Sequence, residues 1–364
     1  MRRALPKPFV GVAFALLLFS GCTCREAPRA SAPSRLRKVD VHVHAEPAAV
    51  PRLVQLMDAR GLDVAVNLSG GWPGAGLEES LAAAKVTNGR VLVFANPPLQ
   101  RLRDARLDVR ELADQLQTAH AMGARGVKFF KSLGLGARWA DGALVAVDDP
   151  RLDPLFEKAG ELSMPVAIHT GDPKAFWEDV TPSNERIDEL TVHPGWSYAR
   201  RDVPSWAALY EAFLRRVARH PRTTFIGVHF GNDPEDPAAV SAALDANPNL
   251  FVDTAARVPE LGRHPPAVMR ALFLRHQDRI LFGTDLGVGV EAHALMLGST
   301  GATPPGPADV DRFFSATWRW LETNDRDFPH PTPIQGRWTI SGLGLPPEVL
   351  KKVYAENADR LLRR

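Results

Sequence analysis

The chain has 364 residues, a formal net charge of +2 at pH 7 and 24% charged residues, without a block of basic side chains. This balance excludes the electrostatic footprint of a nucleic-acid-binding protein, so we expect a small molecule as the partner and no nucleic acid. The length exceeds that of an ordinary domain, yet a barrel of alternating strands and helices reaches it as one unit when its loops are extended.

The N-terminus has the pattern of an export signal. Residues 1–21 begin with basic side chains and continue into an apolar run at 9–19, which predicts a lipoprotein-type signal peptide. The residues up to Cys22 resemble the bacterial lipobox, in which Cys22 carries the lipid; an ordinary cleaved signal peptide is the alternative. Residues 22–36, rich in Ala, Arg, Pro and Ser, are predicted to be a flexible tether to one catalytic domain at 37–364.

This N-terminal part determines where we expect the protein. It should be exported, either periplasmic or lipid-anchored to the bacterial membrane, and its only membrane contact should be the lipid on Cys22. Cys22 and Cys24 are the two cysteines of the chain, so metal ligands in the domain must come from His, Asp, Glu or Lys. The sequence leaves a homo-oligomer open.

Eight apolar, β-branched runs bounded by Gly, Pro or Asn are predicted to be strands. They lie at 37–43, 62–68, 90–95, 125–130, 164–169, 223–229, 249–254 and 279–284. Most are nearly continuous in apolar residues, which is typical of parallel strands covered on both faces.

Segments with helical periodicity alternate with these strands. They are predicted at 49–60, 76–85, 108–122, 151–162, 205–219, 236–246, 265–276 and 347–362. Such alternation fits a closed barrel or an open doubly wound sheet, but no G-x-G-x-x-G follows the first strand. Polar residues instead end many strands, and a barrel collects these at one mouth. We therefore predict a (β/α)8 TIM barrel with long insertions after strand 5 (172–204) and strand 8 (286–346).

The first strand carries a candidate metal-binding pair, His42 and His44. Residues two apart on a strand point to the same face, so both imidazoles can hold one divalent ion. Alone the pair is weak evidence, because a histidine at a strand end is often only hydrogen-bonded. Three further residues end other strands: His169 on strand 5, His229 on strand 6 and Asp285 on strand 8. Four histidines and one aspartate make a nitrogen and oxygen site suited to zinc, or to iron, manganese or cobalt.

This order of residues resembles the amidohydrolase superfamily, in particular its amidohydrolase-related branch, which includes aminocarboxymuconate semialdehyde decarboxylase. The resemblance extends to the stretch 281–285 and to the C-terminal stretch 353–361, which resembles the closing Asn-Ala-x-Arg-Leu helix of the family. It implies that His42, His44, His169 and Asp285 bind a catalytic metal, with His229 beside it. As the catalytic residues, Asp285 would transfer the proton of water and His229 would stabilise an oxyanion or position water.

Lys128 ends strand 4 and leaves the number of ions open. In two-metal amidohydrolases a lysine of strand 4 is carbamylated and bridges the ions, and His169 and His229 would then serve the second ion. The alternatives are an ammonium that binds substrate beside a single ion, or a lysine that reaches the rim of the barrel. We therefore expect one or two divalent ions, with zinc favoured.

These observations predict a metal-dependent hydrolase that uses metal-activated water to cleave a C–N or C–O bond in a small amide, ester or lactone. Non-oxidative decarboxylation by the same fold is the first alternative, and a non-catalytic, metal-retaining binding lipoprotein is the second. Asn67 and Asp253 at strand ends and Arg186 in the strand-5 insertion are candidates for substrate binding.

Overall fold

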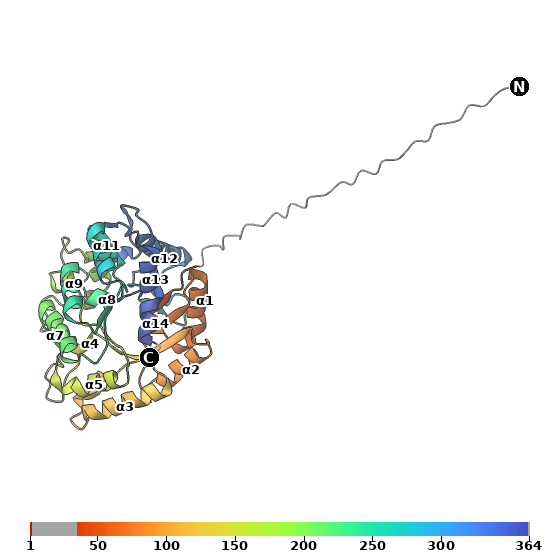
Figure 1. Cartoon of the computed structure of the whole chain (residues 1–364). Coiled ribbons are helices and arrows are strands. Elements are labelled where there is room, and N and C mark those ends of the chain that lie inside the picture. The colour runs from red at the N-terminus through yellow and green to blue at the C-terminus, as the bar shows by residue number, and fades with distance from the viewer. Residues whose placement is uncertain (2–34, 363–364) are drawn as a thin grey trace. The chain divides into compact units, whose positions relative to one another are not determined.

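The computed structural model describes Met1 and residues 35–362 (Figure 1). The predicted signal peptide at 1–21, the lipid on Cys22 and almost all of the predicted tether lie outside the described residues. The residues from Leu36 onward form one compact unit. In the described part of the chain, no helix combines the length and the hydrophobicity needed to cross a membrane.

Eight parallel strands follow one another in chain order. They are β1 (Val39–Ala45), β2 (Val64–Asn67), β3 (Val91–Ala95), β4 (Gly126–Phe129), β5 (Val166–Ile168), β6 (Phe225–Gly227), β7 (Leu250–Asp253) and β8 (Ile280–Leu281). Seven lie inside the predicted runs, and β1 extends two residues beyond its run. Each strand pairs in parallel with the next along the chain. Parallel neighbours in this order require a helical crossover between strands, as the periodicity predicts.

The segment after β8 closes the ring of strands onto β1. Val41 donates its backbone N–H to the carbonyl of Phe282 (3.0 Å), and Asp285 donates to the carbonyl of His42 (2.8 Å). The chain continues as β9 (Leu286–Val288), which pairs in parallel with β1. The predicted (β/α)8 barrel is therefore confirmed, and Asp285 lies at the seam where the ring closes.

Helices surround the strands (Figure 1). The main ones are α1 (Val50–Arg60), α2 (Leu77–Lys85), α3 (Val109–Met122), α5 (Asp153–Glu161), α7 (Trp206–Arg219), α9 (Pro237–Ala246) and α11 (Pro266–Arg275). α3 shows how the sequence sets their limits: the Asp108 side chain accepts the N–H of Arg110, and Gly123 ends the helix with a φ of 117°. A side-chain acceptor at the start and a left-handed residue at the end satisfy backbone groups that a helix leaves unpaired.

The C-terminal helix closes the interior of the barrel. It consists of α13 (Pro347–Lys351), a π-helical turn (Lys352–Glu356) and α14 (Asn357–Leu362). Ala358 and Leu361 belong to the same hydrophobic cluster as Val39 and Val41 from β1. The Asn357 side chain also donates to the carbonyl of Ile280 (2.8 Å). The predicted helix is thus confirmed, and it covers the interior near the start of the strands.

The two predicted insertions carry short elements of their own. After β5 these are α6 (Ile187–Val192) and 3-10 turns at Lys174–Trp177 and Pro194–Trp196. The remaining elements are α4 (Ser132–Leu135), α8 (Val228–Gly231), α10 (Val258–Arg263), β10 (Leu295–Leu297), α12 (Pro307–Glu322), β11 (Phe328–Pro329), β12 (Thr339–Ile340) and 3-10 turns at Pro47–Ala49, Leu99–Arg103, Pro150–Leu152 and Pro333–Gln335. β10 extends the sheet beside β9. In α12 the side chains of Phe314 and Trp320 are buried, which anchors the insertion on the barrel.

Candidate metal centre

Six sequence-predicted residues converge at the carboxyl ends of the strands. They are His42 and His44 in β1, Lys128 in β4, His169 directly after β5, His229 two residues after β6, and Asp285 four residues after β8. Parallel strands of a barrel bring all such positions to one mouth, where barrel active sites lie.

The two β1 histidines are held by their Nδ1 atoms and present their Nε2 atoms to one carboxylate. Nδ1 of His42 lies 2.9 Å from Asp253, and Nδ1 of His44 lies 2.7 Å from the hydroxyl of Ser69. Oδ1 of Asp285 lies 3.3 Å from Nε2 of His42 and 3.2 Å from Nε2 of His44. Partners on Nδ1 fix the orientation of each ring, as for metal-bound histidines in general.

This donor set fits a cation. Burial raises the pKa of Asp285, but His42 and His44 outweigh that effect and hold the pKa below its usual range, so the carboxylate is ionised. Burial also lowers the pKa of His42, which is therefore neutral and keeps its single proton on Nδ1 for Asp253. The lone pair of His42 Nε2 then lies 3.3 Å from an oxygen of Asp285 that cannot donate and 3.5 Å from Nζ of Lys128. The ligand atoms of His42, His44 and Asp285 lie within 4.8 Å of one another, a spacing at which one divalent ion would bind all three.

His169 and His229 form the other side of the centre. Their ring centroids lie 4.4 Å apart, and the His229 ring lies 5.0 Å from that of His42. Nδ1 of His229 donates to the carbonyl of Ala255 (2.9 Å), which leaves its Nε2 without a proton. Nε2 of His169 is buried without a hydrogen-bond partner, since its nearest carboxylate oxygen, of Asp172, is 3.6 Å away. Burial lowers the pKa of His169 to about 4 and that of His229 well below its usual range, so both rings are neutral at pH 7.

Lys128 lies between these groups. Its side chain is fully buried, and Nζ lies 3.5 Å from Nε2 of His42. Burial lowers its pKa to about 8, which brings the neutral amine within reach at mildly alkaline pH. Lys128 thus has both the position and the basicity required of a bridging or a substrate-binding lysine.

Two site residues, His229 and Asp285, and the neighbouring Phe230 have a left-handed backbone. The φ angles of His229, Phe230 and Asp285 are 53°, 59° and 63°. Each costs roughly 1–2 kcal/mol for a residue with a side chain. The N–H of His229 is held by Oδ1 of Asp253 (2.8 Å), and that of Asp285 by the carbonyl of His42. Strained residues fixed in this way gather at functional sites.

Of the three candidates for substrate binding, Asn67 and Asp253 hold the framework of the centre. The Asn67 side-chain amide accepts a hydrogen bond from the N–H of Ala45 and donates one to the carbonyl of Ala45, which connects β2 to β1. Asp253 joins β7 to the ring of His42 and to the backbone of His229. Asp253 is therefore a positioning residue for two members of the centre.

The third candidate, Arg186, lies in a buried ion-pair cluster. Its guanidinium is fully buried and pairs with Glu189 (2.7 Å) and with Glu260. Glu189 lines the cavity beside the metal centre, whereas Arg186 does not. The structure thus brings Arg186 near the site without presenting it there.

Two hollows adjoin the centre. The inner cavity, of about 120 Å³, is lined by Lys131, His169, Asp172, Pro173, Phe176, Glu189, Trp196, His229, Arg257, Asp285, Met296, Gly298, Ser299 and Gln335. The outer groove, of about 500 Å³, is lined by His44, Ala45, Glu46, Pro47, Ser69, Gly287, Val288, Gly289, His293, Ala294, Leu295, Met296 and Thr300. Asp285 lines the cavity and His44 lines the groove, so the metal centre lies where the two hollows meet.

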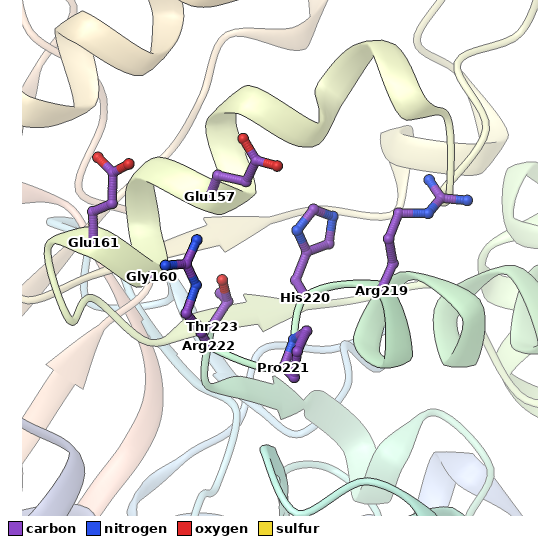
Figure 2. Close-up of a pocket in the computed structure, with 8 residues that line it drawn as sticks. All are labelled: Glu157, Gly160, Glu161, Arg219, His220, Pro221, Arg222 and Thr223. Carbon is purple, nitrogen blue, oxygen red and sulfur yellow. The ribbon is translucent and has the colours of Figure 1, made fainter.

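A further hollow, the α5–α7 cleft, lies near the start of β6 (Figure 2). It measures about 290 Å³ and is lined by Glu157, Gly160, Glu161, Arg219, His220, Pro221, Arg222 and Thr223. None of the predicted site residues is among them.

Three residues of the site were not predicted from the sequence. Asp40 lies two residues before His42 on the same face of β1. It accepts a hydrogen bond from the Thr284 hydroxyl at the seam (2.6 Å). Ser69 follows the strand-end Asn67, and Arg257 lies four residues after the strand-end Asp253. For Ser69 and Arg257, a polar residue just beyond a strand end was the available signal, whereas Asp40 lies inside β1. None of the three belongs to a recognisable motif.

Comparison with known proteins agrees with this geometry. Among solved structures, 2,6-dihydroxybenzoate decarboxylase from Rhizobium is similar over 90% of this chain and 99% of its own, with a TM-score of 0.51 and 17% identity. A structure described as amidohydrolase II is similar over 90% of this chain and all of its own, with a TM-score of 0.52 and 16% identity. At such identities the likeness concerns the fold alone. No curated protein matches this sequence. A sequence model of the family described as amidohydrolase matches residues 39–364, and the chain therefore belongs to the amidohydrolase family.

Proposed function

We propose that this protein is a metal-dependent hydrolase that cleaves a C–N or C–O bond in a small amide, ester or lactone. The observation that carries the proposal is an ionised Asp285 facing the Nε2 atoms of His42 and His44 at the junction of the two hollows. His42, His44, His169 and Asp285 would bind the ion, and zinc suits three imidazoles and one carboxylate. When bound, such an ion polarises a substrate oxygen and makes water more acidic.

Asp285 has the properties of the proton-transfer group. Its ionised carboxylate accepts a proton from water and returns it to the leaving group. Because one of its oxygens faces His42 and His44, the other remains for this exchange. The fixed backbone of Asp285 at the seam holds the carboxylate in place without a flexible loop.

His229 would position the water rather than stabilise an oxyanion. Its proton is on Nδ1, where the carbonyl of Ala255 accepts it, so Nε2 is an acceptor. A neutral acceptor orients a water molecule by receiving its hydrogen, whereas an oxyanion requires a donor.

The test is a panel of amides, esters, lactones and aromatic acids given to the zinc-loaded protein, with released acid and carbon dioxide both measured. Hydrolysis without carbon dioxide is expected. Carbon dioxide without hydrolysis would replace the proposal by decarboxylation, the reaction named for the Rhizobium neighbour. Ligand binding with no turnover of any substrate would favour a binding lipoprotein.

Metal counting decides the role of Lys128. If Lys128 bridges two ions, elemental analysis of the purified protein gives two ions per chain, and Lys128→Gln reduces this to one. If Lys128 binds substrate, the wild-type protein and the variant both hold one ion, and the variant has a higher KM.

We also infer export with a lipid on Cys22, supported by the basic and apolar order of residues 1–21. The expected result is that the wild-type protein partitions into detergent and that Cys22→Ser moves it to the aqueous phase. Equal partitioning of both proteins would leave an ordinary cleaved signal peptide.

A further inference from the structure

The acidic groups of the inner cavity already have partners. Asp172 accepts a hydrogen bond from Lys131 (2.6 Å). Glu189 forms an ion pair with Arg186 through one oxygen and accepts a hydrogen bond from the Ser299 hydroxyl with the other. Asp285 belongs to the metal centre. No carboxylate on the wall of this cavity is therefore left to neutralise a further cation.

Arg257 is that further cation. Only 6% of this residue is exposed, and it lines the inner cavity. Its guanidinium makes one hydrogen bond, from Nη1 to the carbonyl of Ala256 (3.2 Å). Among residues 35–362, no carboxylate oxygen lies within 4.0 Å of a guanidinium nitrogen of Arg257, which is the limit for an ion pair. A guanidinium has five N–H donors, so most of them remain for a ligand in the cavity.

The position of Arg257 ties it to the metal centre. It ends the segment 253–257, in which Asp253 orients His42 and the carbonyl of Ala255 orients His229. Arg257 and His229 also line the same inner cavity. One short loop thus places an unpaired cation and two members of the centre relative to one another.

We propose that Arg257 binds a carboxylate of the substrate, which makes the substrate class small carboxylic acids that carry an amide, ester or lactone bond. This inference rests on the proposed hydrolytic function. A planar guanidinium matches a carboxylate with two parallel hydrogen bonds, and an unpaired buried cation otherwise carries a desolvation cost. Arg186 is the arginine predicted from the sequence to bind substrate, but Glu189 and Glu260 already form ion pairs with it, and it does not line the cavity as Arg257 does.

The two hollows extend this assignment to the rest of the substrate. An inner cavity of about 120 Å³ accommodates only a short acid portion beside Arg257. The larger groove of about 500 Å³, lined by apolar residues such as Leu295 and Val288, accommodates the leaving group. The bond that is cleaved then lies at the junction, beside Asp285 and His44.

Binding of succinate and of its neutral counterpart succinamide to the zinc-loaded protein tests the inference without requiring turnover. Calorimetry should show tighter binding of succinate by the wild-type protein. Arg257→Gln should weaken succinate binding by about 100-fold, in line with the loss of a charge-assisted hydrogen bond, and leave succinamide binding unchanged. The matched control is Arg275→Gln, because Arg275 is 63% exposed on α11 and pairs with Asp245, and it should bind succinate as the wild-type protein does.

Hydrolysis provides the second readout. With the p-nitroanilides of succinic acid and of butyric acid, Arg257→Gln should raise KM for the charged substrate roughly 10-fold or more relative to KM for the neutral one. If Arg257→Gln does not fold, Arg257→Lys takes its place, with succinate binding about 10-fold weaker because the paired geometry is lost. Unchanged succinate binding in the folded variant overturns the inference. Absence of hydrolysis with intact Arg257-dependent binding overturns only the proposed function.

Discussion

The inner cavity and the α5–α7 cleft differ in how their polar groups are satisfied. The cleft, at about 290 Å³, is the larger of the two. Its His220 contacts both Arg216 (2.8 Å) and Asp153 (3.3 Å), and Glu161 pairs with Lys158 (2.6 Å). The inner cavity instead contains imidazole nitrogens without donors and a guanidinium without an anion. Unsatisfied ligand atoms, rather than volume, mark the place where a metal and a substrate would bind.

The largest effect should follow from Asp285→Asn. Loss of the proton-transfer carboxylate and of a metal ligand should lower kcat/KM by roughly 10³-fold or more. Asp245→Asn is the matched control, because Asp245 is exposed and only pairs with Arg275, and it should leave kcat/KM within twofold. If kcat/KM of Asp285→Asn fell by less than 10-fold, the inner cavity would no longer differ from the α5–α7 cleft in its importance for catalysis.

A smaller loss should follow from Asp253→Asn, which alters the residue that orients His42. The amide at this position no longer fixes the proton on Nδ1, and zinc affinity should decrease by about 10- to 100-fold. Competition with a chelator measures this change. Zinc affinity equal to that of the wild-type protein would show that Asp253 only supports the strand.

Substitutions in the α5–α7 cleft should have almost no effect on catalysis. Arg222→Ala and Glu157→Gln remove charges from its wall, and kcat/KM should remain within twofold because these residues lie near the opposite ends of the strands. A tenfold loss with unchanged zinc content would show that the cleft also serves the reaction.

The smallest effect should appear in the acid stability of His220→Gln. Burial, followed by Arg216, lowers the pKa of His220 in the folded protein, so the unfolded chain binds a proton below pH 6.5 that the folded chain rejects. The stabilisation is complete above pH 6.5 and is lost as the pH falls. Between pH 7.5 and 5.5 the Tm of the wild-type protein should therefore decrease by about 1 °C more than that of the variant. An equal or larger decrease in the variant would contradict this assignment.

The sequence predicted the barrel and most of its centre because both depend on regular local signals. Continuous apolar runs located β1 to β8, and strand-end residues such as His169 and Asp285 followed from that alternation. The left-handed backbone at His229 could not be anticipated, because the residue is not a glycine and its N–H is held by Asp253, which is distant in sequence.

The two arginines show why the sequence alone did not reveal the cavity wall. Both Arg186 and Arg257 lie in loops after strands, and the sequence analysis chose Arg186 from the longer insertion. Which of them is left without an anion depends on where Glu189 and Glu260 fold back, and this is a property of tertiary packing.

The seam between β1 and residues 282–288 has a consequence for how the protein acquires its ion. His42 and His44 come from the first strand, whereas Asp285 joins them only when the last strand closes the ring. A partly synthesised or unfolded chain therefore lacks the complete ligand set, and metal capture coincides with the end of folding. Because similar donor sets accept several divalent ions, the compartment in which folding finishes would select the ion by its supply. Co-expression with different metals during folding, rather than exchange into the finished protein, would then determine the metal content.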